Sequence, residues 1–132
     1  MRRRRMGRDF IVESLLVMLG GGAGSWVRFV FGRYANPLLS HFPLGTFLAN
    51  ALSCFVLGFF AYWALQRNSP VLRPLILVGF CGGFSTFSTF SHENLRLLES
   101  GDWKAFLVYT LGSLSAGLGM LLLGGVAGKW LL

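Results

Sequence analysis

The fold is decided by the stretch Gly79-Phe80-Cys81-Gly82-Gly83-Phe84-Ser85-Thr86-Phe87-Ser88-Thr89-Phe90-Ser91, which lies inside a long apolar segment. Its glycines weaken a helix because glycine loses the most backbone freedom on folding. Its hydroxyl groups compete for backbone partners and favour turns and caps over helix interiors. The alternative is a straight helix whose small residues pack closely against neighbouring helices. The density of glycines and hydroxyls favours a break, which at membrane depth is tolerated only inside protein or beside a wet cavity.

The composition of the chain is typical of a membrane protein. Of its 132 residues, 54% are hydrophobic and 13% are charged, whereas a soluble domain has about 25% charged residues. A membrane helix needs about 20 mostly apolar residues, and four segments qualify: residues 10–31, 43–66, 72–98 and 103–130. We therefore predict an all-α membrane protein with four transmembrane helices and a break in the third. Residues 1–9 form a basic N-terminal arm, and residues 10–132 form one transmembrane domain.

The net charge of +7 is concentrated before the first apolar segment. The arm contributes five arginines: Arg2, Arg3, Arg4, Arg5 and Arg8. A basic run can bind nucleic acid, but beside a membrane helix it more often contacts anionic lipid headgroups, so we expect membrane lipid and no nucleic acid as a partner. The first apolar segment is too long for the apolar region of a signal peptide, and we expect it to be retained as a span.

The sequence gives no indication of an enzyme or of a transition-metal site. Cys54 and Cys81 lie in apolar segments without metal-binding spacing and are interpreted as small buried side chains. His41 and His92 are isolated from each other and from the cysteines. The sequence contains no nucleophile with a histidine base, no carboxylate pair and no phosphate-binding loop. We therefore expect a protein that is not an enzyme.

Polar side chains within or beside the predicted spans are candidates for function. Asn50, near the middle of the second span, either forms a helix–helix hydrogen bond or offers its amide to a ligand. Arg28 either extends to the lipid headgroups or lines a wet vestibule and concentrates anions there. Glu93 has the spacing of a helical ion pair with Arg96, and it is also a candidate partner for Arg28.

Phe87 and Phe90 are three residues apart, so they share a face if the helix resumes after the break. Packing in the core or against lipid is the ordinary role of such a pair. The alternative is an anion path, because the edge of an aromatic ring is positive and contacts an anion without the grip of a full charge. Conduction requires binding that is strong enough for the ion to enter and weak enough for it to leave.

Small residues predict close contacts between helices. The chain has 18 glycines, and Gly20 and Gly24 have the spacing that lets two helices approach closely. Such faces also predict an oligomer, because a bundle of four short helices has little interior of its own. At the helix ends, Pro43 suits a first turn, and Asp102 is placed to cap the fourth span.

The sequence resembles the CrcB/Fluc family of fluoride channels. The resemblance depends on three stretches: Gly82 to Ser91 followed by Glu93, Gly21 to Arg28, and Gly45 to Asn50. It covers nearly the whole chain after the arm, and the motif in the third span is specific. The family often has Thr-Thr where this chain has Ser85-Thr86, a change that keeps the hydroxyl group. The arginine-rich arm is not part of the family pattern.

The resemblance implies a passive channel that exports fluoride across the bacterial inner membrane and so limits its toxicity. It implies an antiparallel, dual-topology homodimer with two fluoride pathways along the subunit interface. It assigns Phe87, Phe90, Asn50, Ser113, Thr86 and Tyr109 to the pore and Arg28 to the vestibule. It also implies a structural Na⁺ at the dimer centre, held by the backbone carbonyls of Gly82 and Ser85 from each subunit. Fluoride as the ion follows from the resemblance alone.

Two other functions remain open on the sequence. A small multidrug-type, proton-coupled antiporter also has four helices and dual topology, but it needs a carboxylate deep in the first span. Glu13 is the candidate for that carboxylate, and it lies close to the arginine arm. A membrane assembly subunit that transports nothing would tolerate replacement of Phe87 and Phe90 by other large apolar residues.

Overall fold

The computed structural model describes residues 2–67 and 69–131, without the side chains of residues 2–6, 8 and 65. The described residues form helices and turns and contain no strand. The elements in chain order are α1 (Arg2–Ala35), the 3₁₀ turn η1 (Asn36–Leu38), α2 (Leu44–Arg67), the π-helical segment η2 (Arg73–Phe80), α3 (Cys81–Phe84), α4 (Phe87–Glu99) and α5 (Trp103–Trp130). Four stretches are long and apolar enough to cross a membrane: Asp9–Leu38, Leu44–Ala64, Arg73–Glu99 and Trp103–Trp130. The prediction of an all-α chain with four helices long and apolar enough to span a membrane is confirmed.

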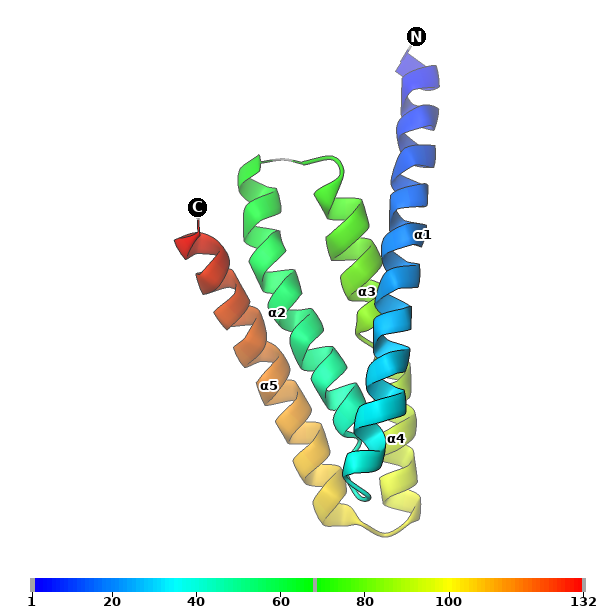
Figure 1. Cartoon of the computed structure of the whole chain (residues 1–132), viewed down its shortest axis with the longest axis vertical. Helices are drawn as coiled ribbons and strands as arrows, with labels where there is room; N and C mark the ends of the chain where they lie inside the picture. Colours follow the sequence, from blue (N-terminus) through cyan, green and yellow to red (C-terminus); the bar gives the residue numbers. More distant parts are fainter. Residues whose placement is uncertain (1, 68, 132) are drawn as a thin grey trace.

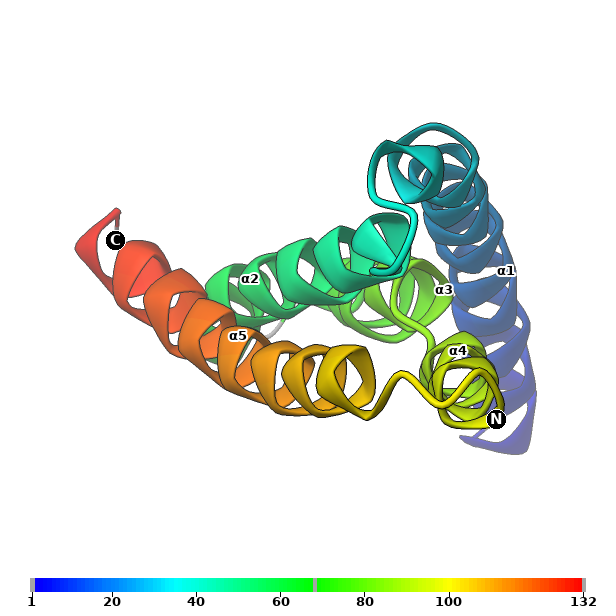
Figure 2. The same cartoon turned by 90° about the horizontal axis from the view of Figure 1, so that it is seen from below.

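The four spans stand side by side, and both chain ends lie at the same end of the bundle (Figure 1). Helix α5 packs along α2, and α1 packs along η2 and α3. Seen from the opposite end, α2 lies between α5 and α1, and α4 lies beside the loop that leads into α5 (Figure 2). The third span therefore contacts α1 with its first half and approaches α5 with its second half.

Glycines on α1 allow its backbone to lie directly against the backbone of the third span. A side chain at Gly24 of α1 would collide with the carbonyl oxygen of Phe80 and would lie 2.7 Å from the amide nitrogen of Phe84. Gly20, one turn earlier, faces the carbonyl oxygen of Leu75 in the same way. The predicted close approach at this pair is confirmed, because each position leaves no room for a Cβ atom.

The third span is broken after Phe84, as predicted. Ser85 (φ −77°, ψ 155°) and Thr86 (φ −153°, ψ 118°) are extended, and α4 begins at Phe87. The π-helical geometry of η2 was not predicted. Pro74 lies near its start and has no N–H to donate to a preceding carbonyl, and π-helical turns often occur near functional sites.

The helix ends follow the local sequence signals with small differences. Helix α1 begins at Arg2 and runs without interruption through the arm, so the boundary proposed after residue 9 is not marked by a helix end and remains a prediction. With 34 residues, α1 is roughly 51 Å long and extends past the other elements at its end of the bundle (Figure 1). Pro43 immediately precedes α2. Asp102 caps α5 through a 3.1 Å bond from the amide of Ala105, which confirms the predicted cap.

Candidate functional site

The break is held open by a side chain from the neighbouring helix. Asn50 lies on α2, and its Oδ1 accepts a 2.7 Å hydrogen bond from the backbone N–H of Thr86. Its Nδ2 donates a longer bond, 3.4 Å, to the carbonyl oxygen of the same residue. The Asn50 amide thus bonds to both the N–H and the carbonyl of Thr86. Of the two roles that the sequence left open for Asn50, the hydrogen bond to a neighbouring helical segment is present.

Four carbonyl oxygens lose their usual helical partners at the break, those of Gly82, Gly83, Phe84 and Ser85. In a continuous helix the amide of Thr86 would donate to Gly82 and the amide of Thr89 would donate to Ser85. Instead the Thr86 amide donates to Asn50, and the Thr89 amide donates to Thr86 Oγ1 at 3.2 Å. Among the described residues, neither the Gly82 nor the Ser85 carbonyl accepts a hydrogen bond. Free backbone oxygens suit a hard cation, so these residues fit the Na⁺ ligands that the resemblance implied.

A groove of about 320 Å³ runs beside the break. Five of the six predicted pore residues line it: Asn50 from α2, Thr86 from the break, Phe87 and Phe90 from α4, and Ser113 from α5. The rings of Phe87 and Phe90 lie 5.8 Å apart between centroids. The remaining wall is apolar apart from Cys54 and Ser85, and no charged residue lines it.

Ser113 adds an unsatisfied polar atom to this groove. Its Oγ is buried and has no hydrogen-bond partner among the described residues. A buried hydroxyl without a partner costs free energy, and such groups usually have a bound water, ion or ligand. The hydroxyl is a donor, so an anion in the groove would satisfy it.

Tyr109, the sixth predicted pore residue, lies outside the groove. Its side chain is fully buried, and its hydroxyl donates to Glu93 Oε2 at 2.6 Å. The ring packs on Phe90, with 5.2 Å between centroids, and on Phe42. Tyr109 therefore supports the Phe90 ring from behind, while its hydroxyl is committed to the carboxylate.

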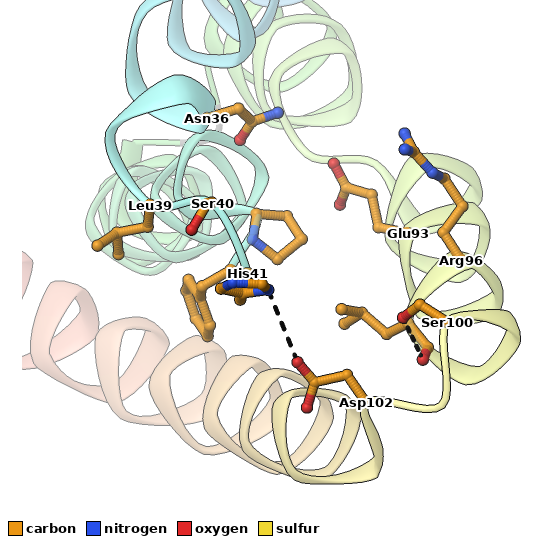
Figure 3. A pocket seen from close by; sticks show the side chains of 11 residues that line it. Asn36, Leu39, Ser40, His41, Glu93, Arg96, Ser100 and Asp102 are labelled. Atoms are coloured by element: carbon orange, nitrogen blue, oxygen red, sulfur yellow. Dashed lines mark hydrogen bonds and ion pairs between the residues drawn. The ribbon is translucent and has the colours of Figure 1, made fainter.

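The predicted ion pair between Glu93 and Arg96 is wrong for the part of the chain that the structure describes. The second carboxylate oxygen of Glu93 accepts a 2.7 Å bond from Thr46 Oγ1. Hydroxyls from α2 and α5 thus occupy both oxygens, and such charge-assisted bonds compete well with an exposed ion pair. Glu93 and Arg96 both line one cleft, which has a volume of about 350 Å³, and Figure 3 shows their side chains there. In the same cleft, His41 Nδ1 lies 3.9 Å from Asp102 Oδ2.

Arg28 lines another cavity, of about 470 Å³. Arg33 lines it as well, together with the hydroxyl-bearing residues Ser25, Thr46 and Thr89. No carboxylate lines this cavity, and no ion pair joins Arg28 to Glu93 within the described residues. The proposed partnership of Arg28 with Glu93 is therefore wrong as a direct contact, because Thr46 occupies the carboxylate oxygen on that side.

Sequence reasoning missed two residues near the break. Ser53 donates to the Cys81 carbonyl oxygen at 2.9 Å, and Cys54 lines the groove. Ser53 is three residues after Asn50 and therefore on the same face of α2, which is a signal that the sequence contained. Cys54 gave no signal beyond its place next to Ser53.

Comparison with known proteins agrees with this architecture. Residues 15–125 match the family described as "CrcB-like protein, Camphor Resistance (CrcB)". The protein named "Fluoride-specific ion channel FluC" in Nitratidesulfovibrio vulgaris is 42% identical over 117 residues, which cover 85% of this chain and 93% of the relative. The protein of the same name in Phocaeicola vulgatus is 39% identical, over 89% of this chain and 95% of the relative. The one in Chlorobium chlorochromatii is 37% identical, over 93% of this chain and 97% of the relative. The chain therefore belongs to the CrcB-like family.

Proposed function

We propose that this protein is a fluoride-selective channel that lets fluoride leave the cell passively and so limits its toxicity. Relatives of about 40% identity are named fluoride-specific ion channels. The observation that supports this function best is the uncharged groove at the break, which is lined by Asn50, Phe87, Phe90 and Ser113. A groove of this kind suits an ion that must pass without being trapped.

The groove offers an anion only weak, neutral contacts. The edges of the Phe87 and Phe90 rings are positive, and the Ser113 hydroxyl has no other partner. Asn50 uses one Nδ2 hydrogen on Thr86 and retains a second, because an amide nitrogen has two. Small, strongly hydrated fluoride would exchange water for these donors step by step, and no fixed positive charge would hold it.

The cavity beside Arg28 and Arg33 supplies the charge that the groove lacks. Both guanidinium groups are positively charged, and no carboxylate lines their cavity. Fixed positive charge at a wet mouth raises the local concentration of anions. We assign this cavity to the vestibule, from which fluoride would enter the groove.

The free carbonyls of Gly82 and Ser85 are proposed ligands of a structural Na⁺. One chain supplies two oxygens, so two copies related by a twofold axis would supply four. The ion would satisfy backbone oxygens that have no hydrogen bond within the described residues and would join the two subunits. It would not itself be transported.

Two copies are proposed to pair antiparallel in the inner membrane of a bacterium. In the most apolar windows of α1 and α5, only 11% and 6% of residues are buried within one chain. These faces contact lipid or a second copy, and a twofold interface uses the same face on both subunits. The groove, with Phe87 78% exposed, would gain its second wall from the partner.

Fluoride efflux from proteoliposomes tests the function. We expect purified protein to release fluoride down its gradient, with little release of chloride, without any imposed proton gradient. Efflux that requires a proton gradient would identify the antiporter. Absence of any anion flux would favour an assembly subunit. The family and the named relatives support the channel over both.

A further inference from the structure

Helix α2 contacts the third span within the break and in the helical turn before it. Asn50 pairs with Thr86, which precedes α4. Ser53 donates its hydroxyl to the carbonyl oxygen of Cys81, the first residue of α3, at 2.9 Å. Asn50 and Ser53 are three residues apart and share one face of α2. One helix face therefore holds Cys81, in the turn before the break, and Thr86, within the break. We refer to Asn50 and Ser53 as the α2 anchors.

The Cys81 carbonyl accepts an unusual number of bonds. Besides the Ser53 hydroxyl, it accepts the backbone N–H of Ser85 at 3.0 Å and the Ser85 hydroxyl at 2.9 Å. The two bonds from Ser85 lie within the third span, whereas the bond from Ser53 comes from another helix. Ser53 is 2% exposed and Cys81 is 3% exposed, so water does not replace the Ser53 bond if it is lost.

Position excludes a direct role for Ser53 in contacting the permeating ion. The residues of α2 that line the groove are Asn50 and Cys54, and Ser53 is not among them. The Ser53 hydroxyl instead fixes the last helical turn before the backbone becomes extended at Ser85. If that turn moves, the Thr86 amide can leave Asn50 and bond to Gly82, which would extend α3 and cover a carbonyl that is now free.

We propose that Ser53 is a positioning residue for the ion path. Its hydroxyl holds the Cys81 carbonyl so that α3 ends at Phe84 and the Gly82 and Ser85 carbonyls stay without helical partners. This inference rests on the proposed function for the measurement of fluoride efflux, but not for the measurement of the Cys81 carbonyl resonance. The competing explanation is an ordinary hydrogen bond between membrane helices, which acts on stability alone.

The test compares Ser53→Ala with Ser53→Thr, which keeps the hydroxyl. Ser100→Ala is the matched control, because the Ser100 hydroxyl also donates to a backbone carbonyl at 2.9 Å, but at the exposed turn before α5. Two quantities are measured: fluoride efflux per folded protein, and the carbonyl carbon-13 resonance of Cys81 in protein labelled at cysteine. The chain has two cysteines, so a Cys54→Ala sample assigns the two signals.

We expect Ser53→Ala to lower efflux by about threefold, because the loss of one hydrogen bond between membrane helices biases an equilibrium by roughly that factor. The Cys81 resonance should move upfield as its carbonyl loses a donor. Ser53→Thr should retain both properties, and Ser100→Ala should change neither.

Several results would overturn the proposal. They are normal efflux in Ser53→Ala, an unchanged Cys81 resonance in that variant, equal loss of efflux in the alanine and threonine variants, and failure of Ser53→Ala to fold. Should the unaltered protein conduct no fluoride, the proposed function falls. The Cys81 resonance would still decide whether Ser53 positions the break.

Discussion

The hydroxyl of Tyr109 on α5 donates to Glu93 on α4 at 2.6 Å, in a place where the tyrosine side chain is fully buried. The other carboxylate oxygen of Glu93 accepts from Thr46 on α2. The second half of the third span is thus joined to two other helices through one carboxylate. Hydrogen bonds to a charged group are stronger than neutral ones, with a net contribution of about 1.5–3 kcal/mol.

Tyr109→Phe should therefore destabilise the protein by about 1–3 kcal/mol. The substitution removes one oxygen and keeps the ring against Phe90. Thermal unfolding of the detergent-solubilised protein measures the effect. Tyr34→Phe is the matched control, because Tyr34 is 73% exposed and forms no side-chain hydrogen bond in the described residues. Equal unfolding midpoints for the two variants would show that the bond to Glu93 contributes nothing.

Gly24→Ala should destabilise the contact between α1 and the third span. A methyl group there would collide with the Phe80 carbonyl and would lie 2.7 Å from the Phe84 amide. Both are backbone atoms, so the two helices would have to separate, at a cost of about 1–3 kcal/mol. Gly22→Ala, on the same helix, has nothing within 4 Å of the added methyl and should not destabilise the protein, and could stabilise it by up to about 1 kcal/mol because alanine favours the helix. A Gly24→Ala protein that unfolds at the wild-type midpoint would contradict this packing.

The spans and the break could be predicted because their causes are local. Apolar length sets the four helices. The break lies where the sequence places Ser85 and Thr86 after two glycines, and Thr86 caps the helix that follows through the Thr89 amide. Cap and turn residues act on their immediate neighbours, so the sequence contains the whole cause.

The partners of the polar side chains could not be predicted because they are distant in the chain. Thr46 is 47 residues from Glu93, and Asn50 is 36 residues from Thr86. The i,i+3 rule suggested Arg96 for Glu93, but a rule for isolated helices ignores donors on other helices. The role of Ser53 could not be predicted for the same reason, because its acceptor, the Cys81 carbonyl, can be identified only once α2 lies against α3. The π-helical geometry of η2 depends on packing as well as on Pro74.

Phe87→Ile and Phe90→Ile should each abolish most fluoride efflux while the protein still folds. Both substitutions keep an apolar side chain but remove the positive ring edge that a passing anion would contact. The measurement is efflux from proteoliposomes with a fluoride electrode. Phe10→Ile is the control, because Phe10 is 70% exposed on α1 and does not line the groove. Normal efflux in both pore variants would remove the rings from the mechanism.

Exchange of Na⁺ for choline should weaken the dimer. A ligand that binds only the assembled state stabilises it by about 2.7 kcal/mol at a concentration 100 times its dissociation constant. We therefore expect the unfolding midpoint to rise with Na⁺ at constant ionic strength, with choline making up the difference. Efflux at a fixed fluoride gradient should fall only as dimer is lost. A midpoint that is independent of Na⁺ would leave the free Gly82 and Ser85 carbonyls without the proposed ion.

The orientation of the chain in the membrane follows from an unequal distribution of positive charge. Both termini lie at one end of the bundle (Figure 1), and the chain turns back at that end between α2 and η2. That end holds Arg2, Arg3, Arg4, Arg5, Arg8, Arg67, Arg73 and Lys129, and the opposite end holds Arg33, Arg96 and Lys104 with Arg28 close by. Positive residues near span ends are retained in the cytoplasm, so the arm favours one orientation. Without the arm, the two ends are nearly balanced, as a dual-topology protein requires.

We predict that both orientations occur and that the arm sets their ratio. A minority orientation is stabilised once it pairs with an antiparallel partner, so the bias of the arm should be incomplete. In a protein without Cys54 and Cys81, a single cysteine at Gln66 or at Ser40 reports opposite ends of the bundle, and both positions are exposed. An impermeant thiol reagent applied outside should label part of each population, and replacement of the five arm arginines by glutamine should bring the two fractions closer together. Labelling of only one of the two positions, in protein that still conducts fluoride, would exclude the antiparallel dimer.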